Sequence, residues 1–163
     1  CNVLVPKDRI VGEPGNGWQQ VTSELAYERS GPERFLSSFR VFVELVRICG
    51  DDPSPHQAAA IGRIASHFMT LRRMSLSVAG MLEAGKDVSV EAALVKELGN
   101  NFEKLLPEIA RLVVPDLSAV DPDKQRLFRE TFEETLMLSP SFTLRGGTRE
   151  IMRGVIARGL GLR

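Results

Sequence analysis

The stretch that decides the fold spans residues 18–49 and reads WQQVTSELAYERSGPERFLSSFRVFVELVRIC. Its apolar residues recur every three to four positions, which is typical of a helix that buries one side. They are Leu25, Phe35, Leu36, Phe39, Phe42, Val43 and Val46. A turn at residues 14–17 precedes the run, so Asn16 is the expected N-cap. Gly31 and Pro32 predict a bend or a loosened hydrogen-bond ladder inside the helix.

Four further segments repeat the helical period. They are residues 55–84, residues 89–115 with a kink at Pro107, a shorter helix that starts at Asp121-Pro122 and breaks at Ser139-Pro140-Ser141, and residues 148–158. The expected core face of the segment 89–115 consists of Leu94, Leu98, Phe102, Leu105, Ile109, Leu112 and Val113. Four antiparallel helices with short loops and one more at the end predict an all-α fold, an up-down four-helix bundle with an extra C-terminal helix.

The first seventeen residues differ in character from the rest. Residues 1–6 read CNVLVP and predict the end of a strand, because they are β-branched and closed by proline. Residues 7–17 are polar and rich in Gly and Pro, as in a linker between a sheet domain and a helical domain. We therefore assign residues 1–17 to the end of a β-domain and its linker, and 18–163 to a helical domain. Since the chain begins without Met on such a segment, we expect a fragment.

Composition excludes several classes of function. The 163 residues fit one domain, and 21 basic residues balance 21 acidic ones, so neither nucleic acid nor an anionic membrane is an expected partner. No apolar run approaches the roughly 18–20 residues of a spanning helix. Cys1 and Cys49 form no disulfide or zinc pattern, which favours a reduced, cytoplasmic setting. His56 and His67 are too far apart on one helix to share a metal, so no metal site is expected.

The segment 143–158 reads TLRGGTREIMRGVIAR and opens a helix with two glycines and a threonine. Glycines there let backbone N–H groups approach a ligand closely, and a helix N-terminus favours an anion. A phosphate site is one interpretation. The other is an ordinary capped helix, with Thr148 as N-cap and Glu150 in the first turn. The local pattern leaves both open.

Taken together, several motifs resemble the C-terminal part of a flavin-dependent acyl-CoA dehydrogenase. They are LAYER at 25–29, GGTREIMR at 146–153 and IAR at 156–158. The segments NVLVP at 2–6, VG at 11–12 and GW at 17–18 are similar to the family's crossing from its β-domain into its helical domain. The resemblance implies FAD as cofactor, an acyl-CoA substrate, an electron-transfer acceptor and a homo-oligomer formed through the helical domain. It covers about the last two-fifths of a typical member.

The resemblance also implies roles for single residues. In most members the catalytic base is a glutamate just before the Gly-Thr of the terminal motif, and here that position is Gly146. In the isovaleryl-CoA and long-chain branches the base precedes an arginine on the first long helix, and Glu28 matches that place. Glu28 is thus the expected catalytic base; the alternative is a solvated or Arg-paired glutamate. Arg29 either binds the CoA side of the substrate or orients Glu28.

Thr148 and Glu150 match the positions that contact the flavin in this family. Two family motifs are absent: residues 52–57 read DPSPHQ in place of Arg-x-x-Phe-Gly, and residues 112–117 read LVVPDL in place of Gly-Gly-x-Gly. The expected function is oxidation of an acyl-CoA to the 2,3-enoyl-CoA with FAD by the full-length protein, the fragment alone being inactive. The alternatives are a non-catalytic helical oligomerisation or regulatory domain, and a generic four-helix ligand carrier.

Overall fold

The computed structural model describes residues 2–162, and these residues are helical with no strand among them. The helices are α1 (Gly17–Ser30), α2 (Glu33–Leu36), α3 (Phe39–Cys49), α4 (Pro55–Glu83), α5 (Ser89–Val113), α6 (Pro122–Phe142) and α7 (Arg149–Gly159), with 3-10 turns η1 (Lys7–Arg9) and η2 (Leu117–Ala119). The predicted all-α class is confirmed. No helix within this part of the chain is both long and apolar enough to cross a membrane.

The strand expected at the start is not confirmed. Residues 2–6 have no regular secondary structure, and Cys1 lies outside the described residues. A strand needs a neighbouring strand to pair its backbone groups, and residues 2–162 provide none. Val3 and Leu4 are 80% and 97% exposed, so this apolar segment has no cover within the chain.

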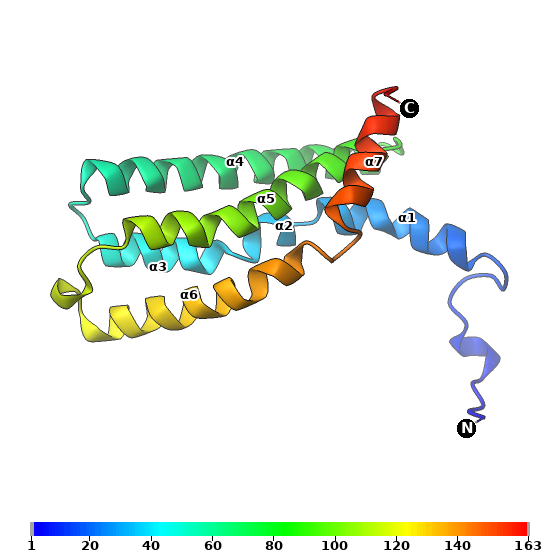
Figure 1. Cartoon of the computed structure of the whole chain (residues 1–163). Coiled ribbons are helices and arrows are strands. Elements are labelled where there is room, and N and C mark those ends of the chain that lie inside the picture. Colours follow the sequence, from blue (N-terminus) through cyan, green and yellow to red (C-terminus); the bar gives the residue numbers. More distant parts are fainter. Residues whose placement is uncertain (1, 163) are drawn as a thin grey trace.

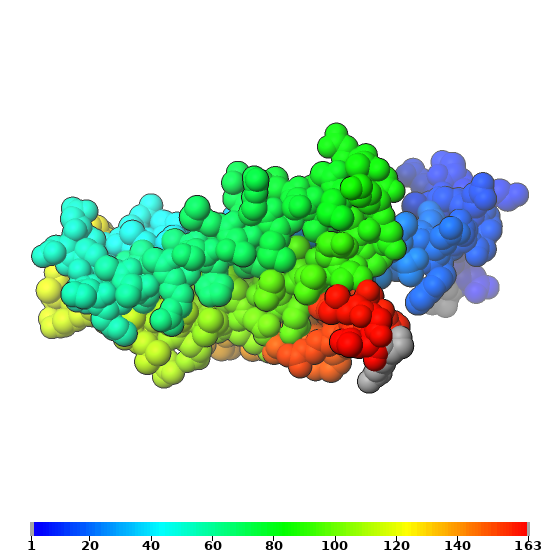
Figure 2. All heavy atoms as spheres, turned by 90° about the horizontal axis from the view of Figure 1, so that it is seen from above, coloured from blue at the N-terminus to red at the C-terminus, as the bar shows by residue number. Residues whose placement is uncertain are grey.

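The helices α3, α4, α5 and α6 lie side by side along an elongated body, while α7 crosses one end of it (Figure 1). Helix α5 is central, because it contacts α1, α2, α3, α4, α6 and α7. Helix α1 and the N-terminal residues lie at the same end as α7 and extend beyond the body, as the space-filling view shows (Figure 2). Segments from the two ends of the chain therefore meet at one end of α5.

The long run that begins at residue 18 is broken twice. Helix α1 ends at Ser30, and Gly31 takes an extended conformation, which confirms the predicted disruption at Gly31-Pro32. The second break, at Ser37-Ser38, was not expected from the sequence. There the Ser37 hydroxyl donates to the Glu33 carbonyl at 2.7 Å, and serine side chains that bond to the backbone in this way compete with helical hydrogen bonds. The apolar stripe thus belongs to three helices rather than one.

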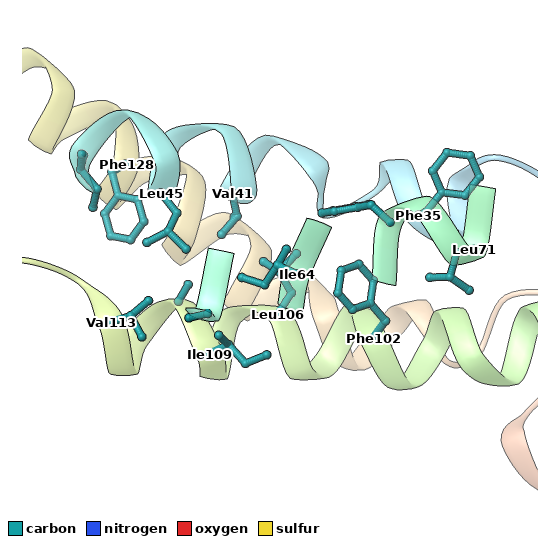
Figure 3. Packing of buried hydrophobic residues seen from close by; sticks show 14 residues of the cluster. Phe35, Val41, Leu45, Ile64, Leu71, Phe102, Leu106, Ile109, Val113 and Phe128 are labelled. Carbon is teal, nitrogen blue, oxygen red and sulfur yellow. The ribbon is translucent and has the colours of Figure 1, made fainter. Parts of the chain in front are cut away.

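One hydrophobic core fills the space between α3, α4, α5 and α6. Figure 3 shows Val41 and Leu45 of α3 facing α5, with Leu106 and Ile109 of α5 and Ile64 of α4 between the helices. Val41, Leu45, Ile64 and Leu106 have no exposed surface. Burying side chains of this size stabilises the fold by about 1.5–3 kcal/mol each, before the entropic cost of ordering them.

Helix ends follow the capping residues that the sequence provides. Ser54 caps α4 through a capping box, in which Gln57 N–H donates to its hydroxyl at 3.3 Å and the Gln57 side chain accepts from Ser54 N–H at 2.9 Å. Asp121 caps α6 as predicted. The predicted break at residues 139–141 is wrong, because α6 continues through Pro140 to Phe142. Pro140 has no N–H to donate to the Leu136 carbonyl, and the Ser139 hydroxyl donates to that carbonyl instead, at 3.2 Å.

The predicted core face of α5 is only partly correct. Leu98, Leu105 and Leu112 are 46%, 43% and 72% exposed, although Phe102, Ile109 and Val113 are buried. Because other helices pack around most of α5, burial extends beyond one apolar stripe. The buried positions instead include polar residues, Lys96, Asn100 and Glu103, each with no exposed surface.

Helix α7 is fastened to α5 by one carboxylate. Glu97 Oε1 lies 3.0 Å from Arg149 Nη2 and 3.1 Å from Arg153 Nε. The Glu97 side chain is 12% exposed, so solvent screens these pairs less than it screens Arg111–Glu108, an ion pair within the same helix whose side chains are 64% and 51% exposed.

We expect Glu97→Gln to lower the free energy of unfolding by about 1–2 kcal/mol, because two charge-assisted hydrogen bonds lose their acceptor charge. Glu108→Gln is the matched control, the same substitution at an exposed pair of the same helix, and should change it by less than about 0.5 kcal/mol. Urea unfolding followed by circular dichroism measures both. Equal effects of the two substitutions would contradict the fastening role of Glu97.

Gly99 lets α2 approach α5 closely. A Cβ atom at Gly99 would lie 2.8 Å from the Arg34 carbonyl oxygen and 2.9 Å from Arg34 Cβ. Backbone cannot move aside as a flexible side chain can, so we expect Gly99→Ala to destabilise the protein by about 1–3 kcal/mol.

Gly62→Ala in α4 is the control, since a Cβ atom there meets nothing within 4 Å. Alanine favours the helix over glycine, so this variant should gain about 0.5–1 kcal/mol. Thermal unfolding of both variants gives the comparison. A Gly99→Ala variant as stable as Gly62→Ala would show that α2 does not pack against α5 in this way.

Candidate functional site

The last turn of α1 is held in place by hydrogen bonds to three other parts of the chain. Because α1 ends at Ser30, the carbonyls of its last turn have no partner within the helix. The buried Arg34 donates from Nη2 to the Glu28 carbonyl at 3.3 Å. Ser75 of α4 donates to the Ser30 carbonyl at 2.6 Å. Arg29, in turn, donates from Nε to the Gly146 carbonyl at 3.1 Å.

Glu28 and Gly146 lie against each other, although they are far apart in the sequence. Arg29, which follows Glu28, is 117 positions from Gly146. A Cβ atom at Gly146 would be 2.9 Å from Glu28 Oε1, so the carboxylate occupies the space that a side chain at position 146 would need. Gly146 has φ +67°, which also favours glycine. The two positions that the resemblance names for the base thus converge on one place. On the surface of this chain the Glu28 side chain is exposed.

Thr148 and Glu150 stand at the start of α7, as predicted. Thr148 is the N-cap, but its side chain makes no capping hydrogen bond, so the side-chain cap of the alternative interpretation is not formed. Glu150 is exposed in the first turn. Hydrogen bonds from the Glu150 N–H and the Thr148 hydroxyl lower the pKa of the Glu150 carboxylate, so this carboxylate already occupies part of the start of α7. The helix N-terminus itself favours a polar or anionic group, and in this respect the segment fits a flavin nucleotide.

The structure brings three of the predicted positions together, Glu28, Arg29 and Gly146. Burial lowers the pKa of Arg29, against the attraction of the Glu28 carboxylate, which raises it. The Gly146 carbonyl already engages Arg29 Nε, and this bond fixes the segment before α7 beside α1.

Sequence reasoning missed a cluster of buried charges beside this site. Arg34, Lys96 and Glu103 are almost fully buried, and Arg145 is partly buried. Arg145 Nη2 lies 3.0 Å from Glu103 Oε1 and donates to the Ser37 hydroxyl at 3.2 Å. Several buried polar atoms have no partner among residues 2–162: Arg34 Nε and Nη1, Glu103 Oε2 and Arg145 Nε.

Burial governs how these groups ionise. It raises the pKa of Glu103 to about 7, against the opposing attraction of Arg145 and Arg34. It lowers the pKa of Lys96 to about 8, and the neighbouring Arg34 lowers it further, while Glu103 and Glu28 raise it. Both groups therefore titrate near neutral pH, which is common in functional sites.

The spacing of polar residues on α5 contained a signal for this cluster. Lys96, Asn100 and Glu103 recur at intervals of four and three, so they share one helix face with the buried Ala92 and Leu106. Polar residues in core positions of a helix indicate a network that needs partners. The leucines of α5 that proved to be exposed, Leu98, Leu105 and Leu112, indicated a different core face in the sequence.

A cavity of about 490 Å³ lies elsewhere, in a groove between α4 and α5. His67 and Phe102 stack there at 5.1 Å between ring centroids, and its polar lining includes Arg63 and Asn101. It contains none of the predicted site residues. No group of three metal-binding side chains occurs within residues 2–162.

Comparison with known proteins points to one family. No family model matches the chain. Among curated proteins, it is 28% identical to acyl-CoA dehydrogenase FadE29 of Mycobacterium tuberculosis, over 96% of this chain and 42% of that protein. It is 30% identical to acyl-CoA dehydrogenase IpdE1 of the same organism, over 95% of this chain and 40% of that protein. It is 26% identical to acyl-CoA dehydrogenase IpdE1 of Mycolicibacterium smegmatis, over 94% of this chain and 38% of that protein.

These matches support the acyl-CoA dehydrogenase family for this chain. The chain spans about two-fifths of the length of these three relatives. They do not distinguish the isovaleryl-CoA or long-chain branch from the others.

The pKa of Glu103 predicts a pH dependence of stability. It rises from 4.5 to about 7 on folding, so the folded state binds more protons than the unfolded state between these values. The stabilisation is therefore present below about pH 4.5 and is lost as the pH rises to about 7.

We expect Glu103→Gln to remove this contribution and flatten the decline in unfolding free energy between pH 5 and 7. The measurement is urea unfolding across that range, with Glu133→Gln, an exposed position on α6, as control. A Glu103→Gln variant that keeps the same pH dependence as the unmodified protein would refute the assignment.

Proposed function

We propose that this chain is the C-terminal helical domain of an FAD-dependent acyl-CoA dehydrogenase. In the full-length protein, an α-proton would be removed from the acyl-CoA and a β-hydride transferred to the flavin, which gives the 2,3-enoyl-CoA. Residues 18–163 would form this domain, and residues 1–17 the end of a β-domain and its linker. The similarity to four acyl-CoA dehydrogenases supports the family. Because the chain spans two-fifths of the first three, we expect the isolated chain to be inactive.

The proximity of Glu28 to Gly146 is the observation that carries the proposal. Glycine at position 146 leaves no side chain to take a proton, and the Glu28 carboxylate fills the same place from α1. A general base must lie within hydrogen-bond reach of the proton that it removes, and position precedes pKa in choosing it. We therefore assign Glu28 as the catalytic base, in the manner of the isovaleryl-CoA and long-chain branch.

The remaining site residues receive supporting roles. Arg29 binds the substrate or orients Glu28, and its bond to the Gly146 carbonyl favours the orienting role. Thr148 and Glu150 contact the cofactor at the start of α7, where the helix N-terminus favours an anionic group. The flavin, when bound, supplies the acceptor for the hydride. Glu150 must meet a hydroxyl or an amide there, since a carboxylate beside a phosphate would repel it.

The helical domain would also bind a second copy. Leu98, Leu105 and Leu112 leave apolar surface on α5, and a homo-oligomer would cover it. The reversal of direction between successive helices α3 to α6 in Figure 1 supports an up-down four-helix bundle with α7 as the extra helix. The other proposed partners of the full-length protein are acyl-CoA and an electron-transfer acceptor.

The test is Glu28→Gln in the full-length protein. Removing a general base should lower kcat by about 10²–10⁴-fold, while flavin content and acyl-CoA binding stay unchanged. Glu24→Gln is the matched control, an exposed glutamate one turn earlier on α1. Turnover measured with an artificial electron acceptor and flavin absorbance give the two readouts.

Retained turnover in Glu28→Gln would contradict the assignment of the base. Loss of both turnover and flavin would point to a structural role. If the unmodified full-length protein neither binds flavin nor turns over acyl-CoA, the second candidate applies, a non-catalytic oligomerisation or regulatory domain. The absence of Arg-x-x-Phe-Gly at residues 52–57 favours that candidate.

A further inference from the structure

Lys96 of α5 lies beneath the candidate site. Its side chain has no exposed surface, and its Cε is 3.4 Å from the place where a Cβ atom at Gly146 would stand. Glu28 Oε1 is 2.9 Å from the same place. The lysine stem and the glutamate carboxylate therefore reach one point from two different helices. Only the missing side chain of Gly146 leaves that point open.

Asn100 forms a hydrogen bond to Lys96 and a second one to the Phe142 carbonyl. In the orientation that satisfies both ends of its amide, Asn100 accepts a hydrogen bond from Lys96 Nζ at 3.1 Å and donates to the Phe142 carbonyl at 3.2 Å. An ammonium has three N–H donors, so this bond leaves two that can point elsewhere. No carboxylate oxygen within the described residues forms an ion pair with Nζ. The lysine is anchored but not neutralised by a direct partner.

Charges from four parts of the chain face Lys96. Arg34 of α2 and Arg145 of the segment before α7 repel its ammonium, while Glu103 of α5 and Glu28 of α1 attract it. Because Arg145 already pairs with Glu103, Glu28 is the attracting carboxylate that forms no ion pair within residues 2–162. Lys96 is buried and Glu28 is exposed, so water screens this attraction less than it would screen a pair of two exposed charges.

We propose that Lys96 is a positioning residue, whose buried ammonium attracts the Glu28 carboxylate toward Gly146 and the substrate. The inference rests on the proposed function in one respect, that Glu28 is the base. It adds Lys96 of α5 to the residues of the candidate site. It also gives a functional reason for burying a charged group, which costs free energy. It also explains the glycine at position 146, because a larger residue would stand between the lysine and the carboxylate.

The pH dependence of turnover separates this role from a merely structural one. Burial lowers the pKa of Lys96 to about 8, so the ammonium loses its charge as the pH rises through that value. In the full-length holoenzyme, kcat should therefore decline on the alkaline side with a midpoint near pH 8. Lys96→Met should lower kcat about 10- to 100-fold, by misplacing the base, with little change in KM, and should abolish this alkaline decline.

Two further variants complete the experiment. Lys96→Arg keeps the charge at all accessible pH values, so it should recover most of the activity without the decline near pH 8. Lys104→Met, the same substitution at an exposed position of α5, should behave like the unmodified enzyme. The proposal is overturned if Lys96→Met keeps both its kcat and the alkaline decline, or if the charge-retaining and the neutral variant are equally impaired while both fold.

A titration without turnover guards against failure of the variants to fold. Lysine labelled with ¹³C at Cε reports the Lys96 midpoint by NMR in the full-length protein. The Glu28 carboxylate raises the pKa of Lys96, so Glu28→Gln should move that midpoint to lower pH. An unchanged midpoint overturns the positioning role even if Glu28 is the base. A shifted midpoint together with full turnover of Glu28→Gln would instead refute the base assignment and leave the contact standing.

Discussion

The ion pair between Arg145 and the fully buried Glu103 determines where the end of the chain lies. A buried carboxylate needs a partner, because an uncompensated charge in the core is strongly destabilising. Arg145 supplies it from the segment that joins α6 to α7, and Phe142 receives the guanidinium over its ring at 4.6 Å. The position of Gly146, the next residue, follows from this pair.

The end of α1 is fixed independently and to the same helix. Arg34 crosses beneath the broken helix and donates to the Glu28 carbonyl, while Gly99 allows α2 to lie close to α5. Arg29 then joins the two segments through the Gly146 carbonyl. The end of α1 and the segment before α7 are distant in sequence, but both pack against α5. The Glu28 carboxylate is therefore positioned by packed helices rather than by a free loop. Such placement is what proton transfer requires.

Much of the fold could be read from the sequence. Capping residues and the 3.6-residue period located α4, α5 and α7 to within about two residues, and Gly31-Pro32 marked the end of α1. The failures have local causes: Ser37 competes with the helix, Pro140 is tolerated in a last turn, and the strand has no partner in the described part of the chain. Propensity describes a residue's own preference, whereas each of these outcomes depends on its neighbours.

The candidate site residues came from motifs, whereas the residues that tertiary packing places beside them did not. Glu28, Arg29 and Gly146 came from the resemblance, and their proximity is a property of the fold that no local pattern contains. Lys96 and Glu103 were missed because charged residues are ordinarily expected to face solvent. Their interval on α5 becomes informative only once α5 is known to be packed on nearly all sides.

The position of the Glu28 side chain in the complete enzyme tests the central claim most directly. A crystal structure of the full-length protein with FAD and an unreactive acyl-CoA analogue would measure the distance from the Glu28 carboxylate to the substrate α-carbon. We predict a separation of about 3–3.5 Å, with Gly146 directly beside the carboxylate. A different carboxylate at the α-carbon, with Glu28 turned into solvent, would contradict the assignment.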